Sequence, residues 1–255
     1  MTMAMTLTLA RQSRETRASV HGNPRWHALS SAAGLALHAY RPDHVLGRIE
    51  RAIEREGADG VDELTTILRR DARARARFRR AVAISVTGHF RDPHQFDLLR
   101  ETIAPSLVSG DRRLRVWSAG CATGHEVYSV AAVLQQIGAL DRAQLLGSDV
   151  LAENIEQARA GAGNDFPVSS AVTTRVRFET RDLLLDGAPD GAFGLILCRN
   201  VGIYLAPPAR GALMAMLAAT LSPDGILLLG RSERLIDPSG YGLEPFAPHA
   251  YRRPA

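Results

Sequence analysis

The chain has 255 residues, of which 45% are hydrophobic and 23% charged, and a formal net charge of +4, which is the composition of a folded globular protein and not of a disordered one. Neither of its two cysteines has a second metal ligand at a zinc-like spacing, so we expect no disulfide framework, no metal site and a reducing, cytoplasmic setting. No long apolar run occurs, so we expect neither a secretion signal nor a membrane span.

Three regions follow one another along the chain. Residues 1–24 show no sustained period and are predicted to be a flexible tail. In residues 25–105 apolar side chains recur at three-to-four spacing, which predicts an N-terminal helical domain, and Pro93 after Asp92 indicates a helix start within it. From residue 106 to 255 short apolar runs alternate with amphipathic stretches. This alternation predicts an α/β domain with a mostly parallel sheet.

Arginine is concentrated in the helical region. The sequence contains no lysine, and the densest basic stretch runs from Arg69 to Arg80. If this stretch is helical, Arg70, Arg73 and Arg77 fall near one face together with Arg80. Such a face is either solvated or a docking surface for a protein partner. Nucleic acid is disfavoured as a partner, because only 5% of the residues are aromatic and no recognition motif appears.

A glycine-containing loop follows the first apolar run of the α/β region. Gly120 and Gly124 allow a tight turn and a close approach of a ligand, and the next residues open a helix whose N-terminal N–H groups are unpaired. The loop lacks the Lys-Ser/Thr of a P-loop and the G-x-G-x-x-G of a dinucleotide site, which disfavours both ligands. Two interpretations of the loop stay open: it binds another nucleotide-type ligand, or it is a plain strand-to-helix connection.

Polar residues end the next three strands, at the edge of a parallel sheet where ligands bind. Asp149 is placed to accept from ribose hydroxyls, or it caps the helix that begins near Leu151. Asp182 and the neighbouring Leu183 face a heterocycle, or they form a turn. Arg199 precedes Asn200, and burying it alone would be costly, so we expect an anionic ligand group or a carboxylate beside it.

Five segments together resemble the CheR-type chemotaxis receptor glutamate O-methyltransferases, which use S-adenosylmethionine. They read VTGHFRDPHQF, VWSAGCATGHEVYSVA, GSDVLAENIEQARAG, CRNVGIYL and LSPDGILLLGRSE, and the resemblance covers roughly residues 25 to 252. It implies a helical domain (25–105) and an S-adenosylmethionine-binding domain (106–255). The second would be a Rossmann-like class I methyltransferase sheet of seven strands, mostly parallel, with the last strand antiparallel.

The resemblance also implies the site. Arg91 and Tyr204 would lie beside the transferred methyl group, with Thr87 and Arg91 contributed by the helical domain. By motif position, the cofactor pocket would be lined by Thr87, Arg91, Gly120, Glu126, Asp149, Asp182, Leu183, Arg199 and Asn200.

Two features depart from the family pattern. His89 and His125 stand where the family usually has phenylalanine and glutamate, and either is a candidate catalytic base for an amine or hydroxyl acceptor. The segment between Ala160 and Arg175 is too short for the small β-subdomain of receptor-docking members.

These departures shape the functional hypotheses. The leading one is an S-adenosylmethionine-dependent methyltransferase acting on a small molecule or carboxylate, with specialised metabolism favoured. The alternatives are a chemoreceptor-type glutamate O-methyltransferase, a repurposed fold that catalyses a non-methylating cyclisation, and a binding protein that has lost turnover.

Overall fold

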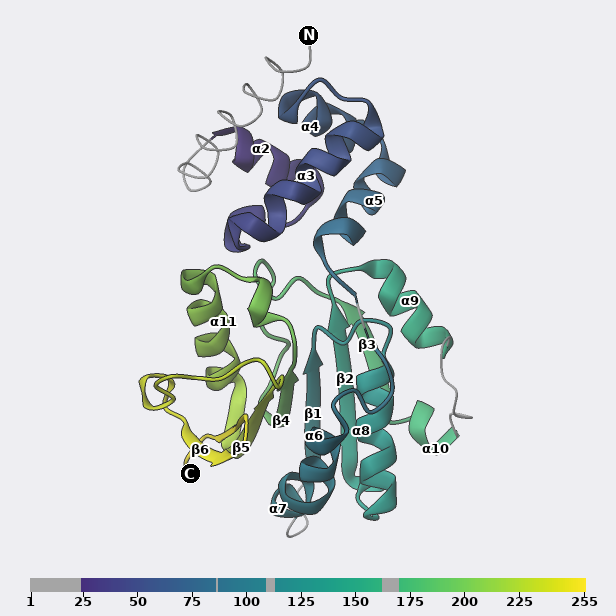
Figure 1. Ribbon diagram of the computed structural model, residues 1–255. Helices are drawn as coiled ribbons and strands as arrows, with labels where there is room; N and C mark the ends of the chain where they lie inside the picture. Colours follow the sequence, from purple (N-terminus) through teal and green to yellow (C-terminus); the bar gives the residue numbers. More distant parts are fainter. Residues whose placement is uncertain (1–23, 86, 109–112, 162–169) are drawn as a thin grey trace. The chain divides into compact units, whose positions relative to one another are not determined.

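The computed structural model describes residues 24–85, 87–108, 113–161 and 170–255 (Figure 1). Apart from Pro24, the expected tail lies outside these residues. Two compact units are present. The helical unit runs to Ile84 and includes Tyr204–Ala209, and the sheet unit comprises Ser85–Ile203 and Arg210–Ala255.

Amphipathic helices form the helical unit, as the three-to-four spacing predicts. Their apolar faces meet in a core that contains the fully buried side chains of Leu29, Leu64 and Phe78. The elements are α2 (Pro24–Ala33), the 3-10 turn η1 (Leu37–Ala39), α3 (Pro42–Glu56), α4 (Val61–Arg70) and α5 (Ala72–Val82).

The arginine-rich stretch from Arg69 to Arg80 is not one continuous helix face, and that expectation is wrong. Asp71 interrupts the helix, and its carboxylate accepts a hydrogen bond from the backbone N–H of Arg73 at 2.7 Å, which caps α5. Arg77 is turned onto Glu56 in α3, with Nε and Nη2 donating to the two carboxylate oxygens at 3.1 and 2.6 Å. This pairing holds the pKa of Glu56 below its usual value.

His44 is half-buried and contacts two aromatic rings within the helical unit. Its ring is stacked with Tyr40 at a centroid distance of 5.7 Å and tilted against Tyr204 at 4.8 Å. Its Nε2 donates to the Val82 carbonyl at 2.9 Å. Burial, with Arg48 and Arg41 nearby, lowers the pKa of His44 below 6.5, because a buried imidazole resists protonation.

We expect His44 to make the protein less stable in acid. Its pKa is lower in the folded state than in the unfolded state, so the unfolded state takes up the proton first. The contribution of neutral His44 is therefore fully present above pH 6.5 and is lost as the pH falls through the lowered pKa. Urea denaturation at pH 7.5 and 5.5 should show a smaller loss of unfolding free energy for His44→Gln than for the wild type. Equal losses would contradict this prediction.

The sheet unit contains one seven-stranded sheet in the order β3-β2-β1-β4-β5-β7-β6. Strands β1 to β5 pair in parallel, β7 is antiparallel to β5, and β6 is antiparallel to β7. This confirms the predicted class I methyltransferase sheet, including its last strand. The strands are β1 (Leu114–Ala119), β2 (Ala143–Asp149), β3 (Val176–Thr180), β4 (Phe193–Cys198), β5 (Leu221–Leu229), β6 (Glu244–Ala247) and β7 (Ala250–Arg252).

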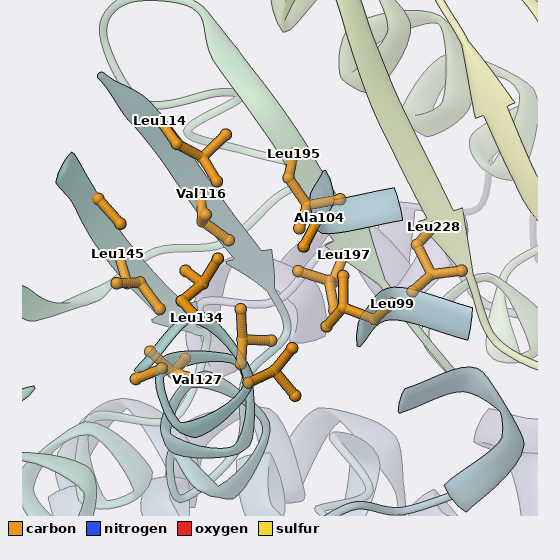
Figure 2. Packing of buried hydrophobic residues seen from close by; sticks show 14 of the residues in the cluster. Leu99, Ala104, Leu114, Val116, Val127, Leu134, Leu145, Leu195, Leu197 and Leu228 are labelled. Atoms are coloured by element: carbon orange, nitrogen blue, oxygen red, sulfur yellow. The ribbon is translucent and has the colours of Figure 1, made fainter. Parts of the chain in front are cut away.

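Helices cover the sheet, and their placement sets the start of the sheet unit. Figure 2 shows Leu99 and Ala104 beside Leu197 of β4, in the same core as Val127 of α8 (His125–Gln136). The sheet unit therefore begins at Ser85, and the domain boundary expected at residue 105 is wrong. The helices concerned are α6 (Pro93–Leu98), the π-helical turn η2 (Leu99–Ile103), α7 (Ala104–Leu107), α8 (His125–Gln136), α9 (Ala152–Ala160) and α11 (Pro207–Thr220).

The connection from α9 to β3 is described in part. Its described residues form the short helix α10 (Ser170–Thr173) and no strand, while residues 162–169 lie outside the described ranges. The absence of a β-subdomain therefore stays a prediction. No helix among the described residues combines the length and apolar content needed to cross a bilayer.

Candidate functional site

The loop between β1 and α8 is fixed to the end of β2. The N–H groups of Gly120 and Cys121 both donate to the Ser148 carbonyl, at 2.8 and 2.9 Å. Gly120 and Gly124 have φ values of 85° and 87°, a region that side chains rarely adopt. A Cβ at Gly120 would come within 2.6 Å of the Val201 side chain. The loop thus needs glycine at both positions, because a side chain would adopt a rarely populated backbone conformation and collide with neighbouring protein side chains.

Asp149 ends β2 and is held by three hydrogen bonds. Oδ2 accepts from the N–H of Ala122 at 2.9 Å, and Oδ1 accepts from the N–H of Leu151 and from Asn154 Nδ2, both at 2.9 Å. A carboxylate has about four acceptor positions, so one remains on Oδ2 for a ligand hydroxyl. Leu151 is itself the N-cap of α9, so Asp149 forms a turn ahead of the helix and does not cap it.

Burial governs the charge of Asp149. It raises the pKa of this carboxyl above 3.8, although the three hydrogen bonds act in the opposite direction. The ionised form is therefore costly in the folded protein. A hydroxyl donor at the remaining position on Oδ2 would offset part of that cost.

Arg199, directly after β4, is the centre of a buried ion-pair network. Its side chain is 2% exposed, with Nη1 2.9 Å from Glu126 Oε2 and Nη2 3.1 Å from Asp92 Oδ2. Nη2 also donates to the Arg91 carbonyl, and Nε donates to Gln95 Oε1 at 2.8 Å. The expectation that a carboxylate lies beside Arg199 is confirmed. The guanidinium therefore connects two parts of the chain: it donates both to the Arg91 carbonyl and to Glu126 in α8.

The segment that carries Arg91 is bent on both sides. Phe90 and Asp92 have φ values of 49° and 60°, which cost a residue with a side chain roughly 1–2 kcal/mol each. Such strain persists only where other contacts impose it, and it clusters at functional sites. Here Phe90 N–H donates to Ser129 Oγ at 3.0 Å, and Asp92 is paired with Arg199. Both Thr87 and Arg91 belong to the sheet unit, so their assignment to the helical domain is wrong.

The structure brings the two unexpected histidines together. The rings of His89 and His125 are 4.5 Å apart between centroids, at an interplanar angle of 57°. His125 Nδ1 lies 2.9 Å from Thr123 Oγ1 in the glycine loop. The pair therefore lies at the first turn of α8, where the loop ends.

Asn200 follows the end of β4 and is hydrogen-bonded to Glu233. Asn200 is in the left-handed region with φ 61°, and its N–H donates to Glu233 Oε2 at 2.6 Å. Sequence reasoning missed Glu233, although a glutamate soon after the apolar run of β5 is a usable signal. It also missed Gln95, whose Nε2 donates to the Leu229 carbonyl at 2.8 Å; nothing in the sequence distinguishes this glutamine.

The remaining candidates are less closely joined to this network. Asp182 follows β3 and starts a turn, in which its Oδ1 accepts from the N–H of Leu184 at 2.8 Å; this matches the turn alternative, and Leu183 beside it is half-buried. Tyr204 belongs to the helical unit. Its pairing with Arg91 beside a methyl group stays a prediction.

Comparisons with known proteins identify the family. Residues 85–164 and 161–242 match the model of the CheR methyltransferase, SAM binding domain. A chemotaxis protein methyltransferase from Listeria innocua is 29% identical over 232 residues, which are 82% of this chain and 88% of that protein. Chemotaxis protein methyltransferase 1 from Pseudomonas aeruginosa is 27% identical over 242 residues, covering 81% and 87%.

Partial similarity to a solved structure is also found. The SAM-bound amino pentose methyltransferase CalS10 from Micromonospora echinaspora has a TM-score of 0.41 and 19% identity, covering 66% of this chain and 58% of its own. The family match includes the glycine loop, the ends of β2 and β4 and the Arg91 segment. The chain therefore belongs to the CheR methyltransferases, enzymes that use S-adenosylmethionine.

Proposed function

We propose that the protein transfers the methyl group of S-adenosylmethionine to a protein carboxylate, such as a glutamate side chain of a chemoreceptor. The observation that carries the proposal is the match, over most of both chains, to relatives named chemotaxis protein methyltransferases. It favours a protein substrate over the small-molecule acceptor that the sequence favoured. It also favours methyl transfer over cyclisation.

The cofactor supplies an electrophilic methyl group on a sulfonium. In our proposal, the loop from Gly120 to Gly124 lies against the cofactor, and Asp149 accepts from one ribose hydroxyl through its remaining Oδ2 position. Glu126 and Asn200 hold the amino-acid end of the molecule, with Thr87 beside them. Leu183, half-buried beside the turn that Asp182 starts, borders the base. Arg199 acts indirectly, because its donors are directed at Glu126, Asp92, Gln95 and the Arg91 carbonyl.

A carboxylate acceptor fits the charges of the chain. It is already ionised at neutral pH, so the enzyme has to align it and does not have to deprotonate it. The Arg91 guanidinium binds the acidic acceptor, and the strained backbone on both sides of it fixes its direction.

A second candidate is methylation of an amine or hydroxyl. The observation that favours it is the His89–His125 pair beside Thr123, because such acceptors lose a proton and a neutral imidazole can take it up. In that case one of the two histidines is the catalytic base.

The exposed arginines of the helical unit fit an acidic protein partner. Arg69, Arg70 and Arg73 are exposed around the break between α4 and α5, whereas Arg77 is engaged with Glu56. We propose that this smaller group, and not the whole stretch to Arg80, contacts the acceptor protein.

Transfer from methyl-labelled cofactor tests the function. The acceptors are a chemoreceptor cytoplasmic fragment, the same fragment with its methylated glutamates changed to alanine, and a pool of low-mass metabolites. We expect label on the first alone, released as methanol by alkali because it is an ester. Alkali-stable label would favour the histidine mechanism, and label confined to low-mass products would refute a protein substrate.

Arg91→Ala should lower turnover by about tenfold or more, which corresponds to about 1.4 kcal/mol in the activation barrier. The physical reason is the loss of the guanidinium that aligns the acceptor. The exposed Arg177 of β3 provides the control, and Arg177→Ala should be silent. If Arg91→Ala and Tyr204→Phe both stayed within about twofold, or roughly 0.4 kcal/mol, neither residue would belong to the mechanism.

A further inference from the structure

Glu233 joins the ends of two neighbouring strands through one oxygen atom. Its Oε2 accepts from the N–H of Asn200 at 2.6 Å and from the N–H of Gly230 at 3.0 Å. Cys198 pairs with Leu229 in the last step of the parallel β4–β5 ladder. Beyond that step, the Glu233 carboxylate connects the segments that follow β4 and β5. Glu233 is 8% exposed, so water competes little for these bonds.

The hydrogen bond from the Asn200 N–H stabilises an unusual backbone conformation. Asn200 lies in the left-handed region with φ 61°, which asparagine adopts more readily than other residues with a side chain but which is still less favourable than the right-handed region. Its N–H would lose this partner if Glu233 were absent, and leaving a partly buried N–H unpaired is unfavourable. The carboxylate therefore stabilises the conformation in which Asn200 leaves β4.

Two glycines make room for this carboxylate. A Cβ at Gly230 would lie 2.6 Å from Glu233 Oε2 and 2.8 Å from the Asn200 nitrogen, and a Cβ at Gly202 would lie 3.1 Å from Glu233 Oε1. The Glu233 backbone is fixed as well, because its N–H donates to the Gly230 carbonyl at 2.8 Å and its carbonyl accepts from His249 Nδ1 at 2.7 Å. Glu233 is thus held on its backbone side and enclosed on its carboxylate side.

We propose that Glu233 is a positioning residue, which holds Asn200 in the left-handed conformation needed for contact with S-adenosylmethionine. The proposal rests on the proposed placement of Asn200 in the cofactor pocket. Glu233 acts through Asn200 and does not touch the cofactor. An amide oxygen can accept the same two N–H groups, so the role depends on the acceptor more than on the charge.

The test measures S-adenosylhomocysteine affinity by calorimetry, together with the melting temperature. We expect Glu233→Ala to bind about tenfold more weakly, the loss typical of one hydrogen bond to a charged group, with Glu233→Gln within about threefold of the wild type. Leu140→Ala is the control for stability alone. Leu140 is buried and lies just before the amino-terminal end of β2, whereas Asn200 follows the carboxyl end of β4. This variant should lower the melting temperature and leave affinity unchanged.

A second pair of variants leaves Glu233 in place. Gly202→Ala crowds Oε1 and should weaken binding by about threefold, an effect of roughly 0.7 kcal/mol. Gly211→Ala should be silent, because a Cβ there meets its nearest neighbour at an ordinary 3.7 Å. If Glu233→Ala fails to fold, this pair and Glu233→Gln decide the matter.

The outcomes separate this proposal from the proposed function. A wild-type protein that does not bind S-adenosylhomocysteine would refute the cofactor assignment. A wild type that binds, with Glu233→Ala or Gly202→Ala binding equally well, would overturn the role of Glu233 alone. Glu233→Gln binding as weakly as Glu233→Ala would also overturn it, because the acceptor would then not be what matters.

Discussion

Replacing Arg199 by alanine should lower the free energy of unfolding by about 3 kcal/mol or more, the cost of breaking a buried ion pair by removing one partner. The substitution leaves Glu126 and Asp92 without their cation, and their side chains are 14% and 27% exposed. It also removes the donor to Gln95 and the donor to the Arg91 carbonyl. Urea denaturation at pH 7 measures the loss.

An exposed arginine provides the matched control for Arg199. Arg100 Nη2 is 2.6 Å from Asp97 Oδ1 and 3.3 Å from Glu101 Oε1, but its side chain is 41% exposed. Exposed pairs contribute about 1 kcal/mol or less, so Arg100→Ala should have a small effect. Similar losses for the two variants would show that burial does not determine the strength of the Arg199 network.

The parallel part of the sheet could be predicted from local sequence patterns, whereas the number of strands and the antiparallel last strand are implied only by the family resemblance. An apolar run followed by a polar residue marks β2 and β4, a run followed by the glycine loop marks β1, and crossover helices between them require parallel pairing. The boundary of the helical unit could not be predicted in this way. Phe96, Leu99 and Ile103 have the spacing of an amphipathic helix whichever core they enter, and here they enter the core of the sheet.

The candidate site shows the same limit. Asp149 and Arg199 could be predicted, because parallel strands bring their carboxyl ends to one edge and because buried arginine demands a carboxylate. The sequence could not show which carboxylate pairs with Arg199, because Glu126 and Asp92 are 73 and 107 positions away from it along the chain and become neighbours only in the folded structure. Glu233 was missed for the same reason, because its proposed role depends on the backbone conformation of Asn200, which the sequence does not show.

The largest effect on cofactor binding is expected for Asp149→Asn, which should weaken S-adenosylhomocysteine binding about 10- to 150-fold. This range corresponds to the roughly 1.5–3 kcal/mol of one hydrogen bond to a charged group, because about one acceptor position of the carboxylate remains for a ribose hydroxyl. Asp141→Asn is the matched control. Asp141 precedes β2 at its other end, and its side chain is 92% exposed, so the affinity should not change.

The raised pKa of Asp149 adds a pH dependence to this prediction. Burial brings the carboxyl to protonation at a higher pH than an exposed aspartic acid, whose pKa is 3.8, and the bound proton removes an acceptor. Wild-type affinity should therefore fall as the pH is lowered, with a midpoint above 3.8, while the Asp149→Asn variant shows no such component.

Asp149→Asn also replaces one carboxylate oxygen by an amide nitrogen, which cannot accept the hydrogen bonds from Ala122, Leu151 or Asn154. The variant should therefore lose some stability as well, and the pH dependence of affinity is the readout specific to the ribose contact. Calorimetric titrations across the acid range, with urea denaturation alongside, measure both effects. Parallel pH profiles for the two proteins would show that this carboxylate does not hold the ribose.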